Sequence, residues 1–300
     1  MVYLQYQQQV RLRAPTMLIA FGGWPDAGEG ASGALRYLAQ KLSAHPFASI
    51  DPEEFYDFTL VRPTVRFNAL GAREITWPAT QFYAWDSGDQ EQDLLLMIGV
   101  EPNLKWRTYS QVVVDLASAH GVARAIVLGA LLDAVPHTRD LRVSGSFTND
   151  PDLQQKLGDL HVRGSRYQGP TGITSALSLA MAEHGIKYGT LWAHSPHYIQ
   201  ATHYPKASLA LLHMLDEVLG LRFDLDDLRA AQEGFDRQFQ EALAKEDELQ
   251  AYVRRLERRY DLAQEERGPL PSPQDMVKEL EDFLKRRRTD GPASAGEGGP

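Results

Sequence analysis

The stretch MLIAFGGWPDAGEGASGALRYLAQKL, residues 17–42, contains the first structural unit of the fold. Residues 17–21 are an apolar run without the polar alternation of a strand that has one face in water, so they predict a strand buried on both faces. A loop rich in glycine follows, and residues 31–42 have the spacing of a helix. The stretch therefore predicts a strand, a loop and a helix in succession.

Three more apolar runs alternate with helical patterns along the chain. The runs are LLLMIGV (94–100), AIVLGALL (125–132) and TLWA (190–193), and the helical patterns span residues 106–120, 171–184 and 206–219. This alternation predicts an α/β fold with crossover connections and a mainly parallel sheet that helices cover on both faces. Residues 54–85 contain strand-like runs and turn residues without a helix between them, so we expect a mixed or antiparallel portion there.

A second region, helical almost throughout, begins near residue 223. From Phe235 to Tyr260 apolar residues recur at alternating steps of four and three, a heptad pattern that only Glu246 interrupts. The sequence SPQD (272–275) predicts the capped start of a further helix. We therefore expect an α/β domain at residues 1–222, a helical hairpin of coiled-coil type at 223–288 and a disordered tail at 289–300.

The composition of the 300 residues is that of a globular protein, with 43% hydrophobic and 24% charged residues. No apolar run approaches the roughly 18 residues of a membrane helix, and the N-terminus lacks the apolar core of a secretory signal. We therefore expect a cytoplasmic protein without membrane contact. The absence of cysteine excludes disulfides, thiolate metal sites and a cysteine nucleophile. The net charge of −9 argues against nucleic-acid binding, which needs clustered lysine and arginine.

The loop GEGASG (28–33) matches two nucleotide-binding patterns only in part. It fits G-x-G-x-x-G, but six residues separate it from the strand, where a dinucleotide fold needs its first glycine. Gly23 and Gly28 have the spacing of a P-loop, yet Glu29 stands where lysine is needed, and a carboxylate repels phosphate. We predict a strand-to-helix connection in which Asp26 caps the helix, with contact to a ligand or partner as the alternative.

Polar residues follow each of the predicted parallel strands. Since the carboxyl ends of such strands meet at one edge of the sheet, where ligands bind, we expect five loop segments to converge there. Acids, bases and anion-binding groups from these segments are the candidate residues for binding a ligand or partner. They are Asp26, Glu29, Glu101, Arg107, Asp133, His137, Arg139, Thr171, His194 and His197. Each also has a structural interpretation, because polar turn residues often satisfy local backbone groups.

Signals for specific chemistry at this edge are few. Thr171 is a natural cap for the helix after it, although such a helix end also suits an anion. The spacing of His194 and His197, with His203 nearby, matches known metal sites poorly, and we expect no metal or cofactor. Ser195 follows a histidine in a proline-containing loop, and no G-x-S-x-G motif occurs. Any catalysis is therefore expected to use carboxylate and histidine acid–base chemistry.

Five segments in order carry a family resemblance. They are FGGWPDAGEGASGALRYL, LLLMIGVEPNLKWRTYS, IVLGALLDAVPHTR, YQGPTGITSAL and LWAHSPHYI, within roughly residues 15–220. They resemble the proteasome assembly chaperone 2 family in its bacterial, largely actinobacterial branch. The resemblance implies a three-layer α/β/α sandwich, related in fold to nucleoside phosphorylases and hydrolases, and self-association into a homo-oligomer.

The same resemblance implies a role in assembly. Eukaryotic and archaeal relatives help to assemble proteasome rings, and many dock through a C-terminal tail of a hydrophobic residue, tyrosine and any last residue. This sequence ends in Glu297, Gly298, Gly299 and Pro300, so that tail is absent from it.

Two functions from different classes follow. The first is a non-enzymatic, oligomeric scaffold or assembly-chaperone-like protein, which holds a protein partner through the apolar stripe of its helical region. That stripe could instead pack on the chain itself. The second is an enzyme or sensor that binds a nucleoside-like or other anionic small molecule at the strand-end edge.

Overall fold

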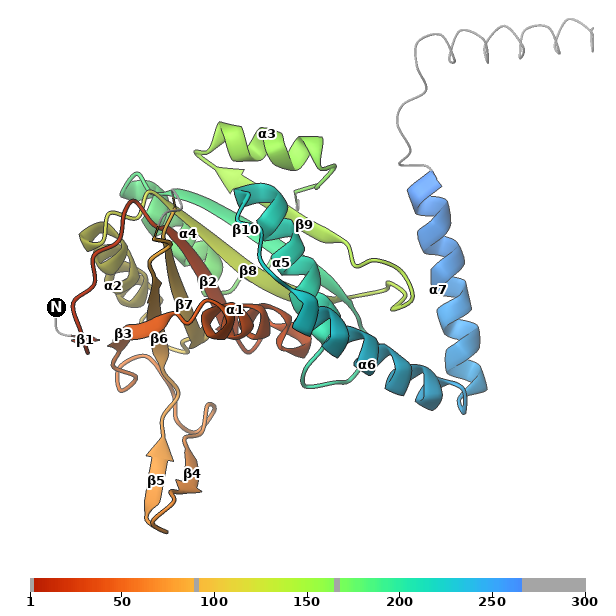
Figure 1. Ribbon diagram of the computed structural model, residues 1–300, viewed down its shortest axis with the longest axis horizontal. Helices are drawn as coiled ribbons and strands as arrows, with labels where there is room; N and C mark the ends of the chain where they lie inside the picture. The colour runs from red at the N-terminus through yellow and green to blue at the C-terminus, as the bar shows by residue number, and fades with distance from the viewer. Residues whose placement is uncertain (1–2, 89–91, 165–167, 266–300) are drawn as a thin grey trace, which may run out of the picture.

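The computed structural model describes residues 3–88, 92–164 and 168–265, and its centre is a mixed eight-stranded sheet (Figure 1). The strands of this sheet are β1 (Leu4–Tyr6), β2 (Thr16–Gly22), β3 (His45–Ile50), β6 (Thr80–Trp85), β7 (Leu94–Val100), β8 (Arg124–Asp133), β9 (Val143–Thr148) and β10 (Lys187–Pro196). They lie in the order β1-β3-β6-β7-β2-β8-β10-β9. A separate hairpin pairs β4 (Thr64–Phe67) with β5 (Arg73–Thr76).

The four apolar runs identified in the sequence form four adjacent parallel strands. β2 lies between β7 and β8, and β10 continues the parallel pairing beyond β8. Toward both edges the pairing is antiparallel, through β1, β3 and β6 on one side and β9 on the other. The α/β class is thus confirmed. The antiparallel part of the sheet also includes β1, β3 and β9, which lie outside residues 54–85. These strands are short and have no long apolar run, so the sequence did not indicate them.

Helices cover both faces of the sheet. They are α1 (Gly30–Lys41), α2 (Trp106–Ala119), α3 (Pro151–Asp159), α4 (Ile173–Glu183) and α5 (Pro205–Leu219), with a short 3-10 helix at Ala27–Glu29. Because successive residues of a strand point to opposite faces, β2 places Leu18 in one core with α1 and α5 and Met17 in a second core with α2 and α4. Two cores separated by the sheet make three layers. Four of these helices, α1, α2, α4 and α5, are those expected from the sequence.

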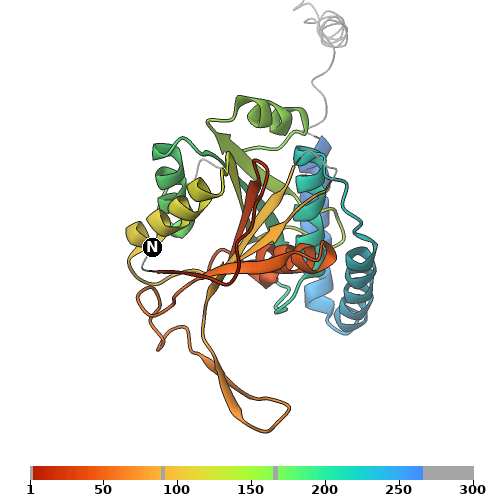
Figure 2. The ribbon, with the colours of Figure 1, turned by 60° about the vertical axis from the view of Figure 1, so that its left-hand side comes forward.

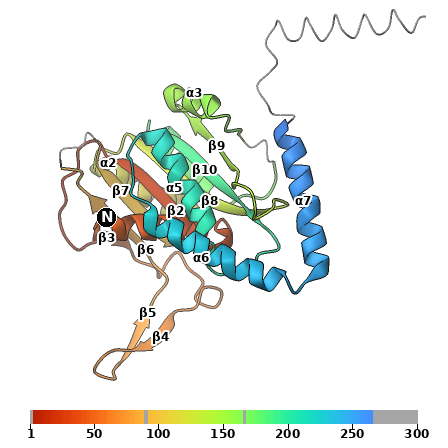
Figure 3. The ribbon, with the colours of Figure 1, turned by 45° about the vertical axis from the view of Figure 1, so that its right-hand side comes forward.

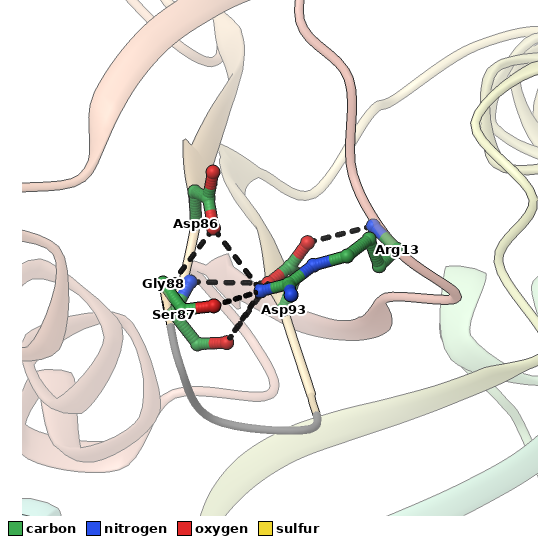
Figure 4. A network of polar contacts seen from close by, with 5 residues as sticks. All are labelled: Arg13, Asp86, Ser87, Gly88 and Asp93. Atoms are coloured by element: carbon green, nitrogen blue, oxygen red, sulfur yellow. Dashed lines mark hydrogen bonds and ion pairs between the residues drawn. The ribbon is translucent and has the colours of Figure 1, made fainter.

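The segment before β2 is tied to the loop between β6 and β7 by a buried carboxylate (Figure 4). Asp93, which is 1% exposed, accepts hydrogen bonds from the Arg13 N–H at 2.6 Å and from the Ser87 N–H at 3.0 Å, and it pairs with the Arg13 guanidinium at 3.2 Å. Burial alone would raise the pKa of Asp93, but these hydrogen bonds lower it overall. This network holds the chain at the opposite end of the strands from the predicted site.

The β4–β5 hairpin stands away from the body of the protein (Figures 1 and 2). It pairs with no other described strand, and all eight of its strand residues are exposed. Cross-strand partners place Val65 opposite Ile75 and Phe67 opposite Arg73. Because side chains alternate along a strand, these four residues share one face of the hairpin.

The helical region consists of α6 (Asp226–Leu243) and α7 (Asp247–Glu265), which are joined by a short turn at residues 244–246 (Figure 3). The heptad pattern is therefore divided between two helices, and the turn coincides with its interruption at Glu246. The further helix expected before residue 288 and the tail at 289–300 lie outside the described residues. No described helix is both long enough and apolar enough to cross a membrane.

Candidate functional site

The loops after the parallel strands share one edge of the sheet, as expected. The strands β2, β7, β8 and β10 run in the same direction and end at Gly22, Val100, Asp133 and Pro196. The candidate side chains do not gather in a single cluster there, because most of them bind a helix that packs on this edge. Arg107 is exposed on α2.

Asp26 caps the first helix, as predicted. Its carboxylate accepts hydrogen bonds from the N–H groups of Ala31 at 2.7 Å and Ser32 at 3.2 Å and also contacts the Ser32 hydroxyl. The residue is 6% exposed, and this burial raises the pKa of Asp26 although the hydrogen bonds lower it. The carboxylate is therefore used to fix the loop to α1.

The glycines of this loop allow close packing against the start of α5. Gly28 has a φ of 61°, and a Cβ atom at this position would lie 2.9 Å from the Cβ of Tyr204. A Cβ on Gly30 would lie 2.7 Å from the Cβ of Ala207. Glu29 extends from the loop to pair with Arg36 on α1. The glycine pattern that resembles a nucleotide-binding loop is thus explained by the approach of two helices.

Glu101 reaches across the fold to the start of α4. Its Oε1 accepts a hydrogen bond from the Ile173 N–H at 2.8 Å, and a Cβ on Gly172 would come within 2.6 Å of the same oxygen. A carboxylate at a helix N-terminus satisfies the free N–H groups and is favoured by the helix dipole. The capping expected of Thr171 thus comes from Glu101, and the Thr171 hydroxyl bonds to Ser175 instead. The position that suits an external anion already holds a carboxylate.

A polar cluster joins the ends of β8, β9 and β10. Oδ2 of Asp133 lies 2.8 Å from Nδ1 of His194 and 3.1 Å from Nη2 of Arg142. Nε2 of His194 lies 2.9 Å from the hydroxyl of Ser144. Burial would raise the pKa of Asp133, but the hydrogen bond to His194 and its neighbours lower it overall. Two predicted residues, Asp133 and His194, meet in this cluster.

His137 lies beneath α6 and not in an open site. Its side chain is buried, with Nδ1 2.8 Å from the Tyr198 hydroxyl and Nε2 2.7 Å from Nε2 of Gln240. Its ring centroid is 4.8 Å from that of Phe239. Burial lowers the pKa of His137 because it disfavours the charged imidazolium. His137 therefore anchors α6 to the edge of the sheet.

Arg139 and His197 contact α7 in a similar way. Nε and Nη2 of Arg139 donate to the two carboxylate oxygens of Asp261 at 2.9 and 2.8 Å. Nε2 of His197 lies 3.3 Å from the hydroxyl of Tyr252, and the neighbouring Val253 is 4% exposed. Together with the packing of α6, these contacts cover the apolar stripe of the helical region with the chain itself. Intramolecular packing is thus the alternative that the described residues adopt.

A large cleft lies between α4 and the β8–β10–β9 part of the sheet, and we call it the β9 cleft. Its volume of about 1720 Å³ exceeds the roughly 300–1,000 Å³ of small-molecule pockets. Three of its apolar side chains are largely exposed, namely Trp24 (70%), Leu132 (58%) and Leu179 (69%). Of the ten candidate residues, all of which lie in the described ranges, Thr171 and His194 line it.

The floor of the β9 cleft contains residues that the sequence analysis missed. Ser144 and Ser146 on β9 and Trp192 on β10 line it, with Arg142 beside them. The six residues of β9, VSGSFT, alternate buried and less buried positions. This period of two is typical of a half-buried strand and could have indicated which side chains face outward.

The fold and the cleft define a class, an α/β protein with a broad, partly apolar cleft at one edge of its sheet. Residues 20–243 match the model of the PAC2 family, and the chain belongs to that family.

Solved structures with similar folds include members of this family. A PAC2 family protein from Streptomyces avermitilis is 40% identical, with a TM-score of 0.67 and coverage of 74% of this chain and 95% of the other. A Mycobacterium tuberculosis protein, described as a proteasome-assembly chaperone homologue, is 36% identical, with a TM-score of 0.71 and coverage of 79% and 99%. A Corynebacterium glutamicum protein is 26% identical, with a TM-score of 0.76 and coverage of 88% and 99%. No match was found among curated proteins.

Proposed function

We propose that this protein is an oligomeric, cytoplasmic scaffold of the assembly-chaperone type, whose role in assembly depends on binding proteins and not on catalysis. Membership of the PAC2 family supports this proposal, as does the similarity to the M. tuberculosis chaperone homologue. The helical region is used for packing on its own chain. We therefore assign the contact between molecules to the β4–β5 hairpin.

The observation that carries this assignment is the apolar surface of the hairpin and its base. The exposed large apolar residues there are Leu60 (72%), Val65 (56%), Phe67 (67%), Leu70 (93%), Ile75 (55%) and Trp77 (46%). A two-stranded hairpin is at best marginally stable alone in water, and an apolar face without a cover is typical of an interaction site. We infer that another protein surface covers this face in the assembled state.

The charge of the hairpin favours a second copy of this chain as its partner. Residues 60–77 contain three arginines and one glutamate, whereas the whole chain has a net charge of −9. A basic, apolar projection therefore has opposite charge to the rest of its own protein. Such complementarity favours association between copies, with the hairpin of one molecule on the acidic body of the next.

Size-exclusion chromatography with light scattering tests the self-association. The double variant Val65→Thr/Ile75→Thr removes an apolar cross-strand pair but keeps β-branched residues, so the hairpin is retained. The wild type is expected to elute as an oligomer and this variant as a 33.6 kDa monomer. The matched control Arg66→Thr/Glu74→Thr changes the pair on the opposite face without altering net charge, and it should remain oligomeric. A monomeric wild type, or equal behaviour of both variants, would remove the hairpin from the proposal.

The assembly role has its own test. Proteasome subunits are mixed with and without this protein, and particle formation is followed by native gel electrophoresis. We expect wild-type protein to change the rate of assembly and the Val65→Thr/Ile75→Thr variant to do so less. An unchanged rate with wild-type protein would exclude a role in proteasome assembly.

A further inference from the structure

Ser144, His194 and Asp133 form a continuous hydrogen-bonded series across three neighbouring strands. The Ser144 hydroxyl lies 2.9 Å from Nε2 of His194, and Nδ1 of His194 lies 2.8 Å from Oδ2 of Asp133. Both distances are within the 2.6–3.2 Å expected between a nucleophile, its base and the group that orients the base. The order serine, imidazole and carboxylate is that of a serine nucleophile with a general base.

The strand pairing fixes this arrangement independently of loop conformation. In the sheet, β10 lies between β8 and β9. Trp192 is the cross-strand partner of Ser144, and Leu131 is the partner of His194. Asp133 ends β8, and its Oδ1 accepts the Ala134 N–H at 2.7 Å. The three side chains therefore come from a rigid part of the fold, which suits a catalytic geometry.

The Ser144 hydroxyl and the His194 imidazole both belong to the lining of a cleft. Ser144 and His194 both line the β9 cleft, whereas Asp133 does not. The His194 side chain is 9% exposed, so water has limited access to it. Ser144 is partly exposed, so its hydroxyl faces a compound that occupies the cleft.

We propose that Ser144 is a nucleophile for acyl transfer, with His194 as its general base and Asp133 as the residue that positions His194. Ser144 Oγ attacks the carbonyl carbon of an ester, and its proton moves to His194 Nε2. The proton then passes to the leaving alcohol as the ester C–O bond breaks, which leaves an acyl group on Ser144. Water, deprotonated by the same imidazole, attacks the acyl carbon. The bond between that carbon and Ser144 Oγ then breaks, the proton returns from His194 Nε2 to Oγ, and the carboxylic acid leaves.

Arg142 limits the rate of this reaction. Its Nη2 lies 2.9 Å from Nδ1 of His194 and 3.1 Å from Oδ2 of Asp133. A guanidinium only donates, so a bond from Arg142 to Nδ1 requires the tautomer with its proton on Nε2, which cannot accept the Ser144 proton. His194 acts as the base only in the other tautomer, in which Nδ1–H donates to Asp133. The N–H groups of Gly145 and Phe147, next on β9, already donate to the Arg163 carbonyl and to Oε1 of Gln154. Loss of one oxyanion donor slows acyl transfer by about 100–1,000-fold. We therefore expect slow turnover of activated esters.

The lining of the cleft indicates the class of substrate. Leu132, Leu141 and Trp192 line the cleft that contains Ser144. These side chains favour an apolar acyl or aryl group, since burying such surface contributes about 25 cal/mol per Å². Short-chain aryl esters fit this chemistry.

A fluorophosphonate probe tests the nucleophile directly. Attack by Ser144 Oγ forms a P–O bond, breaks the P–F bond and releases fluoride, while the proton passes to His194. Intact-mass and peptide mass spectrometry of the full chain should show one label, on Ser144. Ser144→Ala should abolish it, and His194→Gln should slow it about 100-fold, the scale of general-base catalysis.

Ser146 provides the matched control. It lies two residues further along β9, lines the same cleft and is exposed. Ser146→Ala should keep the wild-type labelling rate, and melting curves show that each variant is folded. An absent label, a label on Ser146, or a Ser144 label that His194→Gln does not slow would overturn the proposal. The hairpin variants change none of these residues, so a loss of oligomerisation and a loss of labelling are separate outcomes.

Discussion

Replacing His137 with alanine separates a structural role for this residue from the ligand-binding role that the sequence suggested. The change removes contacts with Tyr198 at 2.8 Å and Gln240 at 2.7 Å, together with the edge-to-face contact with Phe239. Each hydrogen bond contributes about 0.5–1.5 kcal/mol, and an aromatic pair adds a similar amount. We expect a loss of about 2–4 kcal/mol in the free energy of unfolding. At about 2–4 °C per kcal/mol, Tm should fall by roughly 5–15 °C.

Circular dichroism melting measures this loss, and hydrogen exchange of α6 shows where it arises. The matched control is His203→Ala, because the His203 side chain is 71% exposed and contacts Glu29 at 3.0 Å. We expect that control to change stability by no more than about 0.5 kcal/mol. If His137→Ala melts like the wild type and α6 keeps its protection, the anchoring role assigned to His137 is wrong.

Three further predictions concern charge. Burial lowers the pKa of His137, so folding favours the neutral ring. The contribution of His137 to the free energy of unfolding should therefore be complete above about pH 6.5 and be lost as the pH drops through the folded-state pKa. Urea denaturation between pH 5 and 8 should show this slope reduced in His137→Ala, and an identical slope would contradict the assignment. Asp26→Ala should lower the free energy of unfolding by about 1–3 kcal/mol, because it leaves buried N–H groups without an acceptor. Asp26→Asn keeps an acceptor and removes the buried charge, so the loss should be smaller. Equal losses for the two variants in chemical denaturation would refute this. Glu101→Gln keeps the hydrogen bond to Ile173 but removes the charge at the start of α4. The free energy of unfolding should therefore fall by about 0.3–1 kcal/mol in low salt and by less in 1 M salt. A loss that salt does not change would exclude an interaction with the helix dipole.

The two proposals use different parts of the molecule. The hairpin extends from the antiparallel side of the sheet, between β3 and β6 in the chain (Figure 1). The β9 cleft is lined by β9, which lies at the other edge of the sheet. Labelling of wild-type protein and of Val65→Thr/Ile75→Thr at equal rates would show that the two features are independent.

The four parallel strands and the helices α1, α2, α4 and α5 were predictable from the amino-acid sequence alone. Continuous apolar runs and helical spacing are local patterns, and local patterns report how each segment is buried. The cap formed by Asp26 was predictable for the same reason, since it joins residues only five positions apart. Family membership was also recognisable, because its segments occur in order along the chain.

The contacts between distant side chains depend on the packing of the whole fold. Glu101 and Ile173 are 72 positions apart, and His137 and Gln240 are 103 apart, so no local period relates them. Arg139 and His197 were predicted as binding residues because their own segments do not show that α7, much later in the chain, packs on them. Ser144 was missed since β9 is a short strand with small polar residues, and its place beside His194 depends on antiparallel pairing with β10. Local patterns encode burial, whereas contacts between elements depend on how the whole sheet and its helices assemble.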